Sequence, residues 1–417
     1  MNPADTPTAT STPPRHAAPA LPCSPTGELL VSGVPASKLT AQCGTPLYAI
    51  SRQAVAERVA LLRSVLPAGI RLHYAIKANP MPALVDCLAK QIDGFDVASE
   101  RELALAIAAG HGGLDIGFAG PAKRDPELRA AAACGAVVQV ESAGELARLA
   151  GIARAEQLPA RAAVRINPDF ELRQSSVRMG GGPQAFGVDA EQVPALLRAW
   201  PQGVEFIGFH IYAGSQNLNA THIASALQQS YALCRQLAAD APSAPQVFNL
   251  GGGFGIPYFA GETRLDLTPI GAALATIQQQ GVRDFPGLRL VLELGRYLVG
   301  EAGVFLTRVI DKKVSRGQIY LLCDGGMHQH LAASGNFGQV LRRNFPIWLA
   351  TAVNAAPSIS ANICGPLCTP LDILGQGVEL PAVEVGDLIA IGQSGAYGAS
   401  ASPAGFLSHP PAHEVLV

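Results

Sequence analysis

Short apolar runs of strand length recur along most of the chain, separated by stretches rich in Ala and Leu with a helical period. Eight such runs occupy residues 72–76, 94–98, 114–119, 137–141, 162–167, 206–211, 246–250 and 288–293. Helical stretches lie, for example, at 101–109, 126–133, 144–155 and 193–200. Strand and helix alternating in this way predict an α/β fold, a (β/α)8 barrel. In that fold the chemistry lies at the carboxyl ends of the strands.

The pattern changes on both sides of the predicted barrel. Further strand-like runs follow at 304–311, 319–323, 388–391 and 414–417. Few helical stretches separate them, which predicts a mostly β domain over 299–417. Residues 1–22 are rich in Pro, Thr, Ala and Ser and predict a disordered tail. We expect residues 23–45 to supply a strand that joins the β domain. The barrel is expected over 46–298, entered through the apolar segment TPLYAIS at 45–51.

Composition and charge exclude several classes of protein. Of 417 residues, 48% are hydrophobic and 15% are charged, so the chain can bury a large core and is not intrinsically disordered. A net charge of −2 argues against nucleic acid or an anionic membrane as a partner. No apolar run reaches the roughly 18 residues of a membrane span, and no signal-peptide pattern opens the chain. The eight scattered cysteines suggest neither a disulfide framework nor a zinc motif, so we expect a cytoplasmic protein.

Lysine is scarce in this chain, which draws attention to one lysine in an apolar setting. Only six of the 30 basic residues are lysines, and Lys77 ends the first apolar run, in the segment HYAIKANP. It is either a lysine that snorkels from a strand end or a partly desolvated amine that forms a Schiff base. Asp96 follows the second run and is expected near this amine.

Residues suited to a flat, anionic ligand follow three later runs. His210 ends the sixth run and is either a core histidine or an imidazole that stacks on a flat ring. The seventh run leads into LGGGFG, where Gly252 and Gly253 offer backbone N–H groups to an anion. After the eighth run, Glu293 and Arg296 form either a local ion pair or contacts to a ring nitrogen and a phosphate. Taken with the Schiff-base lysine, these features predict pyridoxal 5'-phosphate in the barrel.

Several short motifs occur in an order typical of one family. They are HYAIKAN, FDVAS, HIYAGSQ, LGGGFG, E-x-G-R, CDGG, GPLC and GAYG. From about residue 25 to 415 the chain resembles the alanine-racemase-fold (fold type III) pyridoxal phosphate-dependent decarboxylases, which include diaminopimelate, ornithine and arginine decarboxylases. The resemblance implies a barrel with a C-terminal β domain, removal of the α-carboxylate of an amino acid, and a homodimer with shared active sites.

The resemblance also implies roles for the catalytic residues. Lys77 forms the Schiff base, His210 stacks on the cofactor ring, and Glu293 pairs with the pyridinium nitrogen. A carboxylate at that nitrogen keeps it protonated, which makes the ring a strong electron sink. Cys368, offered by the partner subunit, returns a proton to the substrate carbon after carbon dioxide leaves.

A second set of residues is implied at the phosphate. Ser215, Gly252, Gly253 and Arg296 hold the phosphate group in this family pattern, and Tyr397 lies near both the phosphate and the Schiff base. We expect Arg296 and Tyr397 to border the substrate as well.

Two other functions share parts of the pattern. An amino acid racemase of the same fold places an Arg at the ring nitrogen, so Glu293 and Cys368 argue against a racemase. Non-catalytic pyridoxal phosphate proteins lack either the second domain or the catalytic set. This chain has a predicted β domain and keeps Lys77, Cys368 and Tyr397, so a decarboxylase is the preferred interpretation.

The residue after Cys368 bears on the substrate. Ornithine and diaminopimelate decarboxylases commonly carry an acidic residue there, which pairs with the distal amine of the substrate. Here the residue is Thr369. Loss of that carboxylate should weaken the binding of a free diamino acid, unless Asp372 takes its place.

Two longer segments refine the resemblance. Residues 167–194 and 330–346 look like the decarboxylases linked to exosortase A gene clusters, and like the glutamyl-carrier-protein decarboxylase of butirosin biosynthesis. Relatives in siderophore pathways act on amide-linked amino acids. The resemblance therefore implies, as an alternative to a free amino acid, a substrate that is amide-linked or tethered to a carrier protein. Arg342 and Arg343 would then meet a remote carboxylate or phosphopantetheine.

Overall fold

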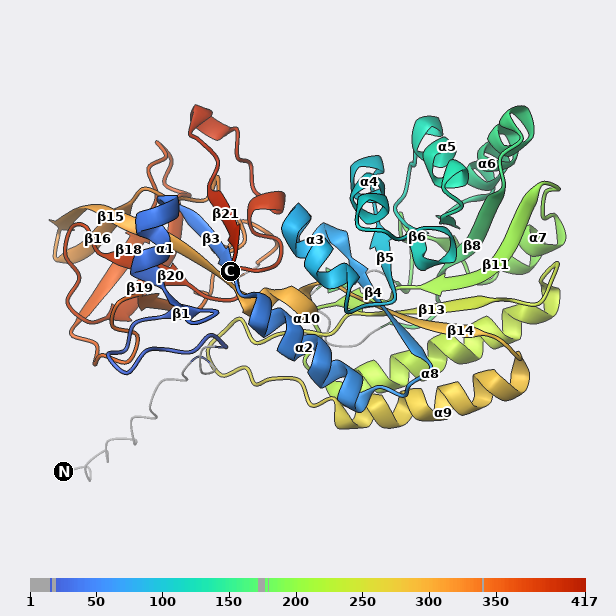
Figure 1. Ribbon diagram of the computed structural model, residues 1–417, viewed down its shortest axis with the longest axis horizontal. Helices are drawn as coiled ribbons and strands as arrows, with labels where there is room; N and C mark the ends of the chain where they lie inside the picture. The colour runs from blue at the N-terminus through green and yellow to red at the C-terminus, as the bar shows by residue number, and fades with distance from the viewer. Residues whose placement is uncertain (1–15, 17–19, 172–176, 179, 340) are drawn as a thin grey trace, which may run out of the picture.

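Eight parallel strands close into a barrel, as predicted (Figure 1). In barrel order they are β4 (Ile70–Ala75), β5 (Gly94–Val97), β6 (Ile116–Phe118), β7 (Val137–Val140), β8 (Ala160–Asn167), β11 (Val204–Ile211), β13 (Val247–Gly252) and β14 (Arg289–Leu294). Pairing of β14 with β4 closes the ring. The computed structural model describes residues 16, 20–171, 177–178, 180–339 and 341–417. Most of the tail expected over 1–22 therefore lies outside the described residues.

Helices cover the outer face of the barrel (Figure 1). They are α2 (Arg52–Val65), α3 (Pro82–Ala89), α4 (Glu100–Ala108), α5 (Asp125–Ala133), α6 (Ala143–Glu156), α7 (Val193–Arg198), α8 (Ala220–Leu237) and α9 (Thr268–Asp284). Ser51, Ser99 and Ser142 cap three of them, because each hydroxyl accepts a hydrogen bond from a first-turn backbone N–H. Alternate strand residues such as Leu72 and Phe95 are buried in the main hydrophobic core. The other alternate residues point into the barrel.

A second sheet of eight strands forms the β domain. Its strands are β3 (Leu47–Ile50), β15 (Gly303–Ser315), β16 (Gln318–Cys323), β17 (Ile347–Leu349), β18 (Ile359–Cys364), β19 (Ile373–Leu380), β20 (Leu388–Ile391) and β21 (His413–Leu416). The sequence predicts β15, β16, β20 and β21 and misses β17, β18 and β19. Strand β17 has only three residues, and Gly375 and Gly377 interrupt the apolar alternation of β19.

The N-terminal segments lie elsewhere than expected. Among the described residues, strand β1 (Leu30–Val31) pairs only with β2 (Val34–Pro35) and does not join the large sheet of the β domain. Helix α1 (Ala36–Cys43) follows. Strand β3, expected at the entrance of the barrel, instead pairs with β15 and β21 in the β domain. All of its residues are buried, so its apolar pattern is compatible with either domain and only its partners decide.

The β domain lies against the carboxyl ends of the barrel strands (Figure 1). Helix α10 (Arg296–Val299) leads from β14 towards β15. The backbone N–H of Tyr397 donates to the carbonyl of Ala78 at 2.7 Å. The side-chain amide of Asn79 donates to the carbonyl of Gly395 at 3.0 Å. The GAYG segment of the β domain therefore contacts the loop that follows β4.

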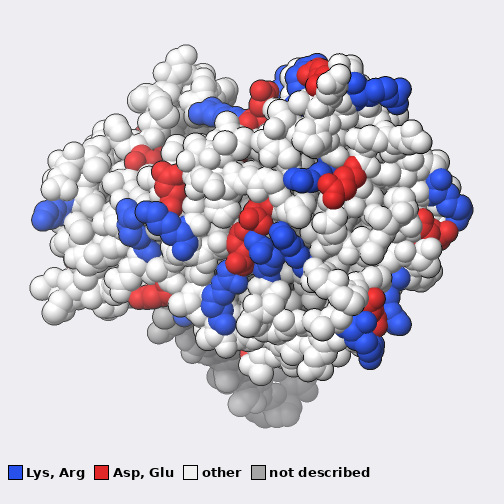
Figure 2. Space-filling model, turned by 45° about the vertical axis from the view of Figure 1, so that its right-hand side comes forward, with Lys and Arg blue, Asp and Glu red and all other residues white. Residues whose placement is uncertain are grey.

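Charged side chains on the face drawn in Figure 2 form small groups of both signs, separated by uncharged surface. Ion pairs with exposed members include Arg129–Glu156 at 2.6 Å and Arg198–Asp240 at 2.7 Å. Exposed pairs of this kind contribute about 0–1 kcal/mol each. Among the described residues, no helix has the length and apolarity needed to cross a membrane.

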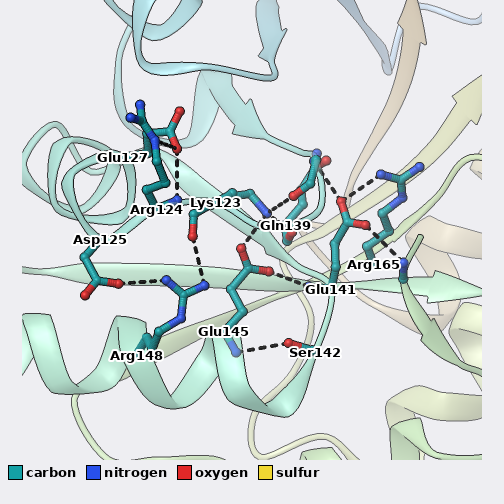
Figure 3. A network of polar contacts seen from close by, with 12 residues as sticks. Lys123, Arg124, Asp125, Glu127, Gln139, Glu141, Ser142, Glu145, Arg148 and Arg165 are labelled. Atoms are coloured by element: carbon teal, nitrogen blue, oxygen red, sulfur yellow. Dashed lines mark hydrogen bonds and ion pairs between the residues drawn. The ribbon is translucent and has the colours of Figure 1, made fainter. Parts of the chain in front are cut away.

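A buried network of charged residues joins the ends of β6, β7 and β8 (Figure 3). The ammonium of Lys123 donates to Glu145 at 2.9 Å and to the backbone carbonyls of two further residues. Glu141 accepts a hydrogen bond from Arg165 at 2.8 Å. All four side chains are buried, and their formal charges cancel. The network therefore satisfies groups that would be costly to bury alone.

Replacing Lys123 by Met should destabilise the fold strongly. The methionine keeps the length of the side chain but leaves the Glu145 carboxylate buried without its cation. We expect the free energy of unfolding to fall by about 3–5 kcal/mol, measured by urea denaturation. Arg148→Met is the matched control, because the Arg148–Asp125 pair at 2.7 Å is exposed and should contribute less than about 1 kcal/mol. Equal effects of the two substitutions would contradict the prediction.

Candidate active site

Lys77 meets two residues from other strands at the mouth of the barrel. Its Nζ lies 3.0 Å from Oε1 of Glu293. The second oxygen of Glu293, Oε2, lies 3.2 Å from Nε2 of His210. Strands β4 and β14 are neighbours in the barrel, which places Lys77 and Glu293 side by side. Glu293 and His210 are buried, whereas 36% of the Lys77 side chain is exposed. Three residues predicted from three separate runs are therefore brought together.

The electrostatics of this group favour a charged ion pair. Burial by itself lowers the pKa of Lys77, but the charge and hydrogen bond of Glu293, together with the nearby Tyr397 and Tyr212, outweigh burial, and the pKa of Lys77 is raised. Burial raises the pKa of Glu293, but Lys77 and His210 outweigh burial, and the pKa of Glu293 is lowered. An amine is a nucleophile only when it is neutral. Lys77 must therefore lose a proton before it can react.

Arg296 lies where the two domains meet. Its Nη1 donates to the hydroxyl of Tyr258 at 2.8 Å. Its guanidinium carbon lies 4.6 Å from the ring centre of Tyr397, a residue of the β domain. The Nε of Arg296 is buried and has no hydrogen-bond partner among the described residues. Arg296 and Tyr397 thus converge next to the loop that carries Lys77.

The glycine-rich loop after β13 lies beside the segment that contains Ser215. The N–H of Asn217 donates to the carbonyl of Gly253 at 3.0 Å, and the N–H of Gly255 donates to the carbonyl of Asn217 at 2.8 Å. A Cβ atom on Gly252 would lie 2.3 Å from the carbonyl oxygen of Glu293, so no larger residue fits there. Three of the residues predicted to bind phosphate, Ser215, Gly252 and Gly253, therefore lie in neighbouring segments, next to the strand that carries Glu293.

Asp96 lies deeper in the barrel than expected. Its carboxylate accepts hydrogen bonds from Gln139 at 3.0 Å and Asn249 at 3.3 Å. No ion pair joins it to Lys77 within the described part of the chain. The register explains this result, because Asp96 pairs with Ala75, and Lys77 stands two residues further along the chain. The expectation that Asp96 lies near the lysine amine and the cofactor stays a prediction, and in this structure its carboxylate is hydrogen-bonded to residues inside the barrel.

Two tyrosines of this site were not predicted from the sequence. The ring centre of Tyr212 lies 5.3 Å from Nζ of Lys77. Burial raises the pKa of Tyr212 to about 12, so its phenol is neutral at neutral pH. Tyr258 accepts the hydrogen bond from Arg296. The position of Tyr212, two residues after His210 at the end of a strand, was the signal that could have identified it.

The segment around Cys368 forms a turn between β18 and β19 in the β domain. Cys368 is exposed, and the hydroxyl of Thr369 accepts a hydrogen bond from the N–H of Leu371 at 3.3 Å. Asp372 is buried, and its carboxylate accepts the backbone N–H groups of Met327 at 2.6 Å and of a turn residue at 2.8 Å. Asp372 therefore stabilises the turn, which argues against the substrate contact considered from the sequence.

The two arginines expected to contact the substrate differ in their surroundings. The exposed Arg342 donates to the carbonyl of Ser334. Arg343 lies over the ring of Phe259, with 3.7 Å between the guanidinium carbon and the ring centre, and 3.6 Å from Glu262. Both arginines are exposed; Arg343 is held against the barrel, whereas Arg342 is bonded to the loop that contains Ser334.

Comparison with known proteins agrees with this geometry. A family model described as the pyridoxal binding domain of pyridoxal-dependent decarboxylases matches residues 52–300. Over 386 residues the chain is 38% identical to an L-glutamyl-(BtrI acyl-carrier protein) decarboxylase of Niallia circulans, covering 91% of this chain and 90% of that protein. It is 34% identical to a diaminopimelate decarboxylase of Deinococcus radiodurans, covering 89% of this chain and 90% of that protein.

The fold has close counterparts among solved structures. The structure of diaminopimelate decarboxylase from M. jannaschii in co-complex with L-lysine superposes with a TM-score of 0.84 at 26% identity, covering 95% of this chain and 92% of that chain. The resemblance inferred from the short motifs is confirmed. Since the family model spans more than half of the chain and both relatives match over nearly their whole length, the chain belongs to the pyridoxal phosphate-dependent amino acid decarboxylases.

Proposed function

We propose that this chain decarboxylates an amino acid whose distal end is amide-linked or carried on a carrier protein. The observation that carries the proposal is the turn after Cys368, where Thr369 replaces an acidic residue and the carboxylate of Asp372 is occupied by backbone N–H groups. A free diamino acid finds no open carboxylate in this turn for its distal ammonium. The similarity to a decarboxylase named for a glutamyl-carrier-protein substrate supports the same substrate class.

The residues at the end of β4, β11 and β14 suit the cofactor ring. Pyridoxal phosphate, when bound, supplies a sink for the electron pair released as the C–C bond breaks. In the proposed site Glu293 would hold a proton at the ring nitrogen, Lys77 would provide the amine that attaches to the cofactor, and His210 would lie beside the ring. A carboxylate that now binds an ammonium is suited to bind a protonated ring nitrogen instead, which frees Lys77.

We propose that residues from three segments hold the phosphate. Gly252 and Gly253 present backbone rather than side chains, and Ser215 lies in the segment beside them. Arg296 contributes a charge, and its buried Nε has no hydrogen-bond partner among the described residues. We assign Tyr397, stacked near that guanidinium, to the border between phosphate and substrate.

We further propose that the active enzyme is a homodimer in which Cys368 acts in the site of the other subunit. Cys368 is exposed, and no hydrogen bond or ion pair joins it to Lys77, Glu293 or His210 in the described part of the chain. As the proposed proton donor, its thiol returns a proton to the substrate carbon after carbon dioxide leaves.

Arg342 is the proposed contact for the remote end of the substrate. It donates to the carbonyl of Ser334. The hydroxyl of Ser334 accepts from the amide of Asn336, which also donates to the carbonyl of Leu371 in the Cys368 turn. The guanidinium therefore lies on a loop joined to that turn and suits a carboxylate or phosphate.

The experiment that tests the proposed substrate class measures carbon dioxide release by the cofactor-loaded protein. The panel contains meso-diaminopimelate, lysine, ornithine, arginine and glutamate as free amino acids, and glutamate as a thioester on a carrier protein. We expect turnover of the carrier-linked substrate and no measurable turnover of the free amino acids. Turnover of free meso-diaminopimelate at a comparable rate would overturn the proposal and make Thr369 a tolerated variation.

Thr369→Glu should open the site to diamino acids. The new carboxylate would pair with a distal ammonium, and a hydrogen bond to a charged group contributes about 1.5–3 kcal/mol. We therefore expect kcat/KM for meso-diaminopimelate or ornithine to rise about tenfold or more. Thr369→Gln is the matched control, since it adds similar volume without charge. An equal response to both substitutions, or to neither, would count against the role of this position.

A further inference from the structure

A layer of polar residues lies inside the barrel below Lys77 and Glu293. Each of its four members is at least nine-tenths buried: His73, Asp96, Gln139 and Asn249. Interiors of such barrels are normally filled by branched apolar side chains. Apolar residues of this kind lie directly beside the polar layer, in a buried cluster of Val137, Ala163, Ile207, Val247 and Val291, and four of them line the same cavity. Burying polar side chains here is costly, so we expect this polar layer to have a specific role.

Two glycines on neighbouring strands make room for this layer. A Cβ atom on Gly94 would lie 2.6 Å from Nε2 of His73. A Cβ atom on Gly117 would lie 2.5 Å from Oδ1 of Asp96. Contacts that short do not occur between real atoms, so any other residue at these positions would displace the polar side chains. The barrel is built around them.

Several polar atoms of the layer have no hydrogen-bond partner among the described residues: Nδ1 and Nε2 of His73, Oδ2 of Asp96, Oε1 of Gln139 and Nδ1 of His210. Nδ1 of His73 lies 3.2 Å from Oδ2 of Asp96, but their orientation does not make a hydrogen bond. The four side chains line one cavity of about 20 Å³, which is enough for a single water molecule. Within the described residues, no group of three His, Cys, Asp or Glu is arranged to hold a metal ion.

We propose that one enclosed water molecule in this cavity positions His210. The Nε2 of His210 faces a carboxylate, which only accepts, so the ring proton sits on Nε2. Nδ1 of the neutral ring is then an acceptor that needs a donor. The water donates one proton to this Nδ1 and the other to Oδ2 of Asp96, and its oxygen accepts from His73. Glu293 thus sets the tautomer, and His73 and Asp96 are positioning residues that, through the water, fix the orientation of His210.

The imidazole that faces Glu293 is held in the same way whichever substrate the enzyme uses, because the water and its partners belong to the protein itself. His73, a buried titratable residue that the proposed mechanism leaves unused, acquires a role as the donor to this water.

The test combines two variants with a structural and a spectroscopic measurement. Asp96→Asn keeps the shape of the side chain, and His73→Phe removes both ring nitrogens. In the full-length protein, a high-resolution crystal structure should contain one water between Asp96 and His210. Nitrogen-15 NMR should show the His210 proton on Nε2, and in both variants the Nδ1 signal should shift, because the water that donates to this nitrogen is lost or turned. We expect kcat of the loaded enzyme to fall by about 10- to 100-fold, with KM nearly unchanged.

His111→Phe is the matched control. His111 lies just beyond α4, where its Nε2 contacts the carbonyl of Ala89 at 3.2 Å, so its loss should leave the His210 spectrum and kcat unchanged. A dry cavity at high resolution would overturn the proposal, and so would a His210 spectrum that both variants leave unaltered. If His73→Phe fails to fold, the isosteric Asp96→Asn variant still decides the outcome.

Discussion

Lys77→Ala is expected to lower carbon dioxide release by at least about 10⁴-fold, since removing a residue that forms a covalent intermediate costs up to about 10⁶-fold in other enzymes. The same substitution should abolish covalent attachment of the cofactor, because the only amine hydrogen-bonded to Glu293 among the described residues is lost. Attachment is measured by mass spectrometry after borohydride reduction. Lys90→Ala is the control, since Lys90 is exposed at the end of α3. A variant that keeps full activity would sink the assignment of Lys77.

Mixing this variant with Cys368→Ala tests the shared site. Each variant alone should be nearly inactive. If Cys368 acts across a dimer interface, a hybrid dimer contains one site that has lost both residues and one intact site. Random exchange of subunits should then restore about a quarter of the wild-type activity. No recovery, in a mixture whose subunits demonstrably exchange, would contradict the proposed dimer site.

Glu293→Gln is expected to lower carbon dioxide release by about 10²–10³-fold. Glutamine has the same shape, but its neutral amide does not keep a proton on the ring nitrogen, so the electron sink is weakened. The cofactor should still bind, which its visible absorbance reports. Because the charge of Glu293 raises the pKa of Lys77, its removal should lower that pKa. In this variant, cofactor attachment should therefore remain fast at lower pH than in the wild-type protein.

Glu301→Gln separates catalysis from folding. Glu301 is also buried and ion-paired, with Arg58 and with Arg264 at 3.0 Å, but it does not contact Lys77 or His210. Both glutamine variants remove a buried charge, so a general loss of stability should affect them alike. If Glu301→Gln reduced turnover as much as Glu293→Gln, the special role of Glu293 would be refuted.

The amino-acid sequence alone was enough to predict the barrel and most of its mouth. Eight apolar runs of strand length fix the number of barrel strands, and the fold places every strand end on one face. Residues far apart in the chain, such as Lys77, His210 and Glu293, are thereby brought together. It was enough to know that each residue follows a barrel strand, because all the strand ends of a barrel lie close together on one face.

The sequence did not determine contacts that depend on which partner lies opposite. The buried residues of β3 suit either domain, and only pairing with β15 and β21 places this strand in the β domain. Asp372 carries a carboxylate whatever its surroundings, and only the folded turn shows that backbone N–H groups occupy it. Likewise, the depth of Asp96 in the barrel depends on the register between neighbouring strands. The pattern of residues within one segment of the chain does not determine that register.

Local propensity and hydrophobic period thus determined most helices and strands of this protein, their order, and the strand ends at which the candidate site lies. Tertiary structure alone decided the packing inside the barrel, where glycines on adjacent strands leave space for His73 and Asp96. This space exists only between two paired strands, so it forms when the barrel closes. The physical reason is that the hydrophobic period along the chain tells which side of a strand a residue faces, whereas a contact also depends on the residue opposite it on the neighbouring strand.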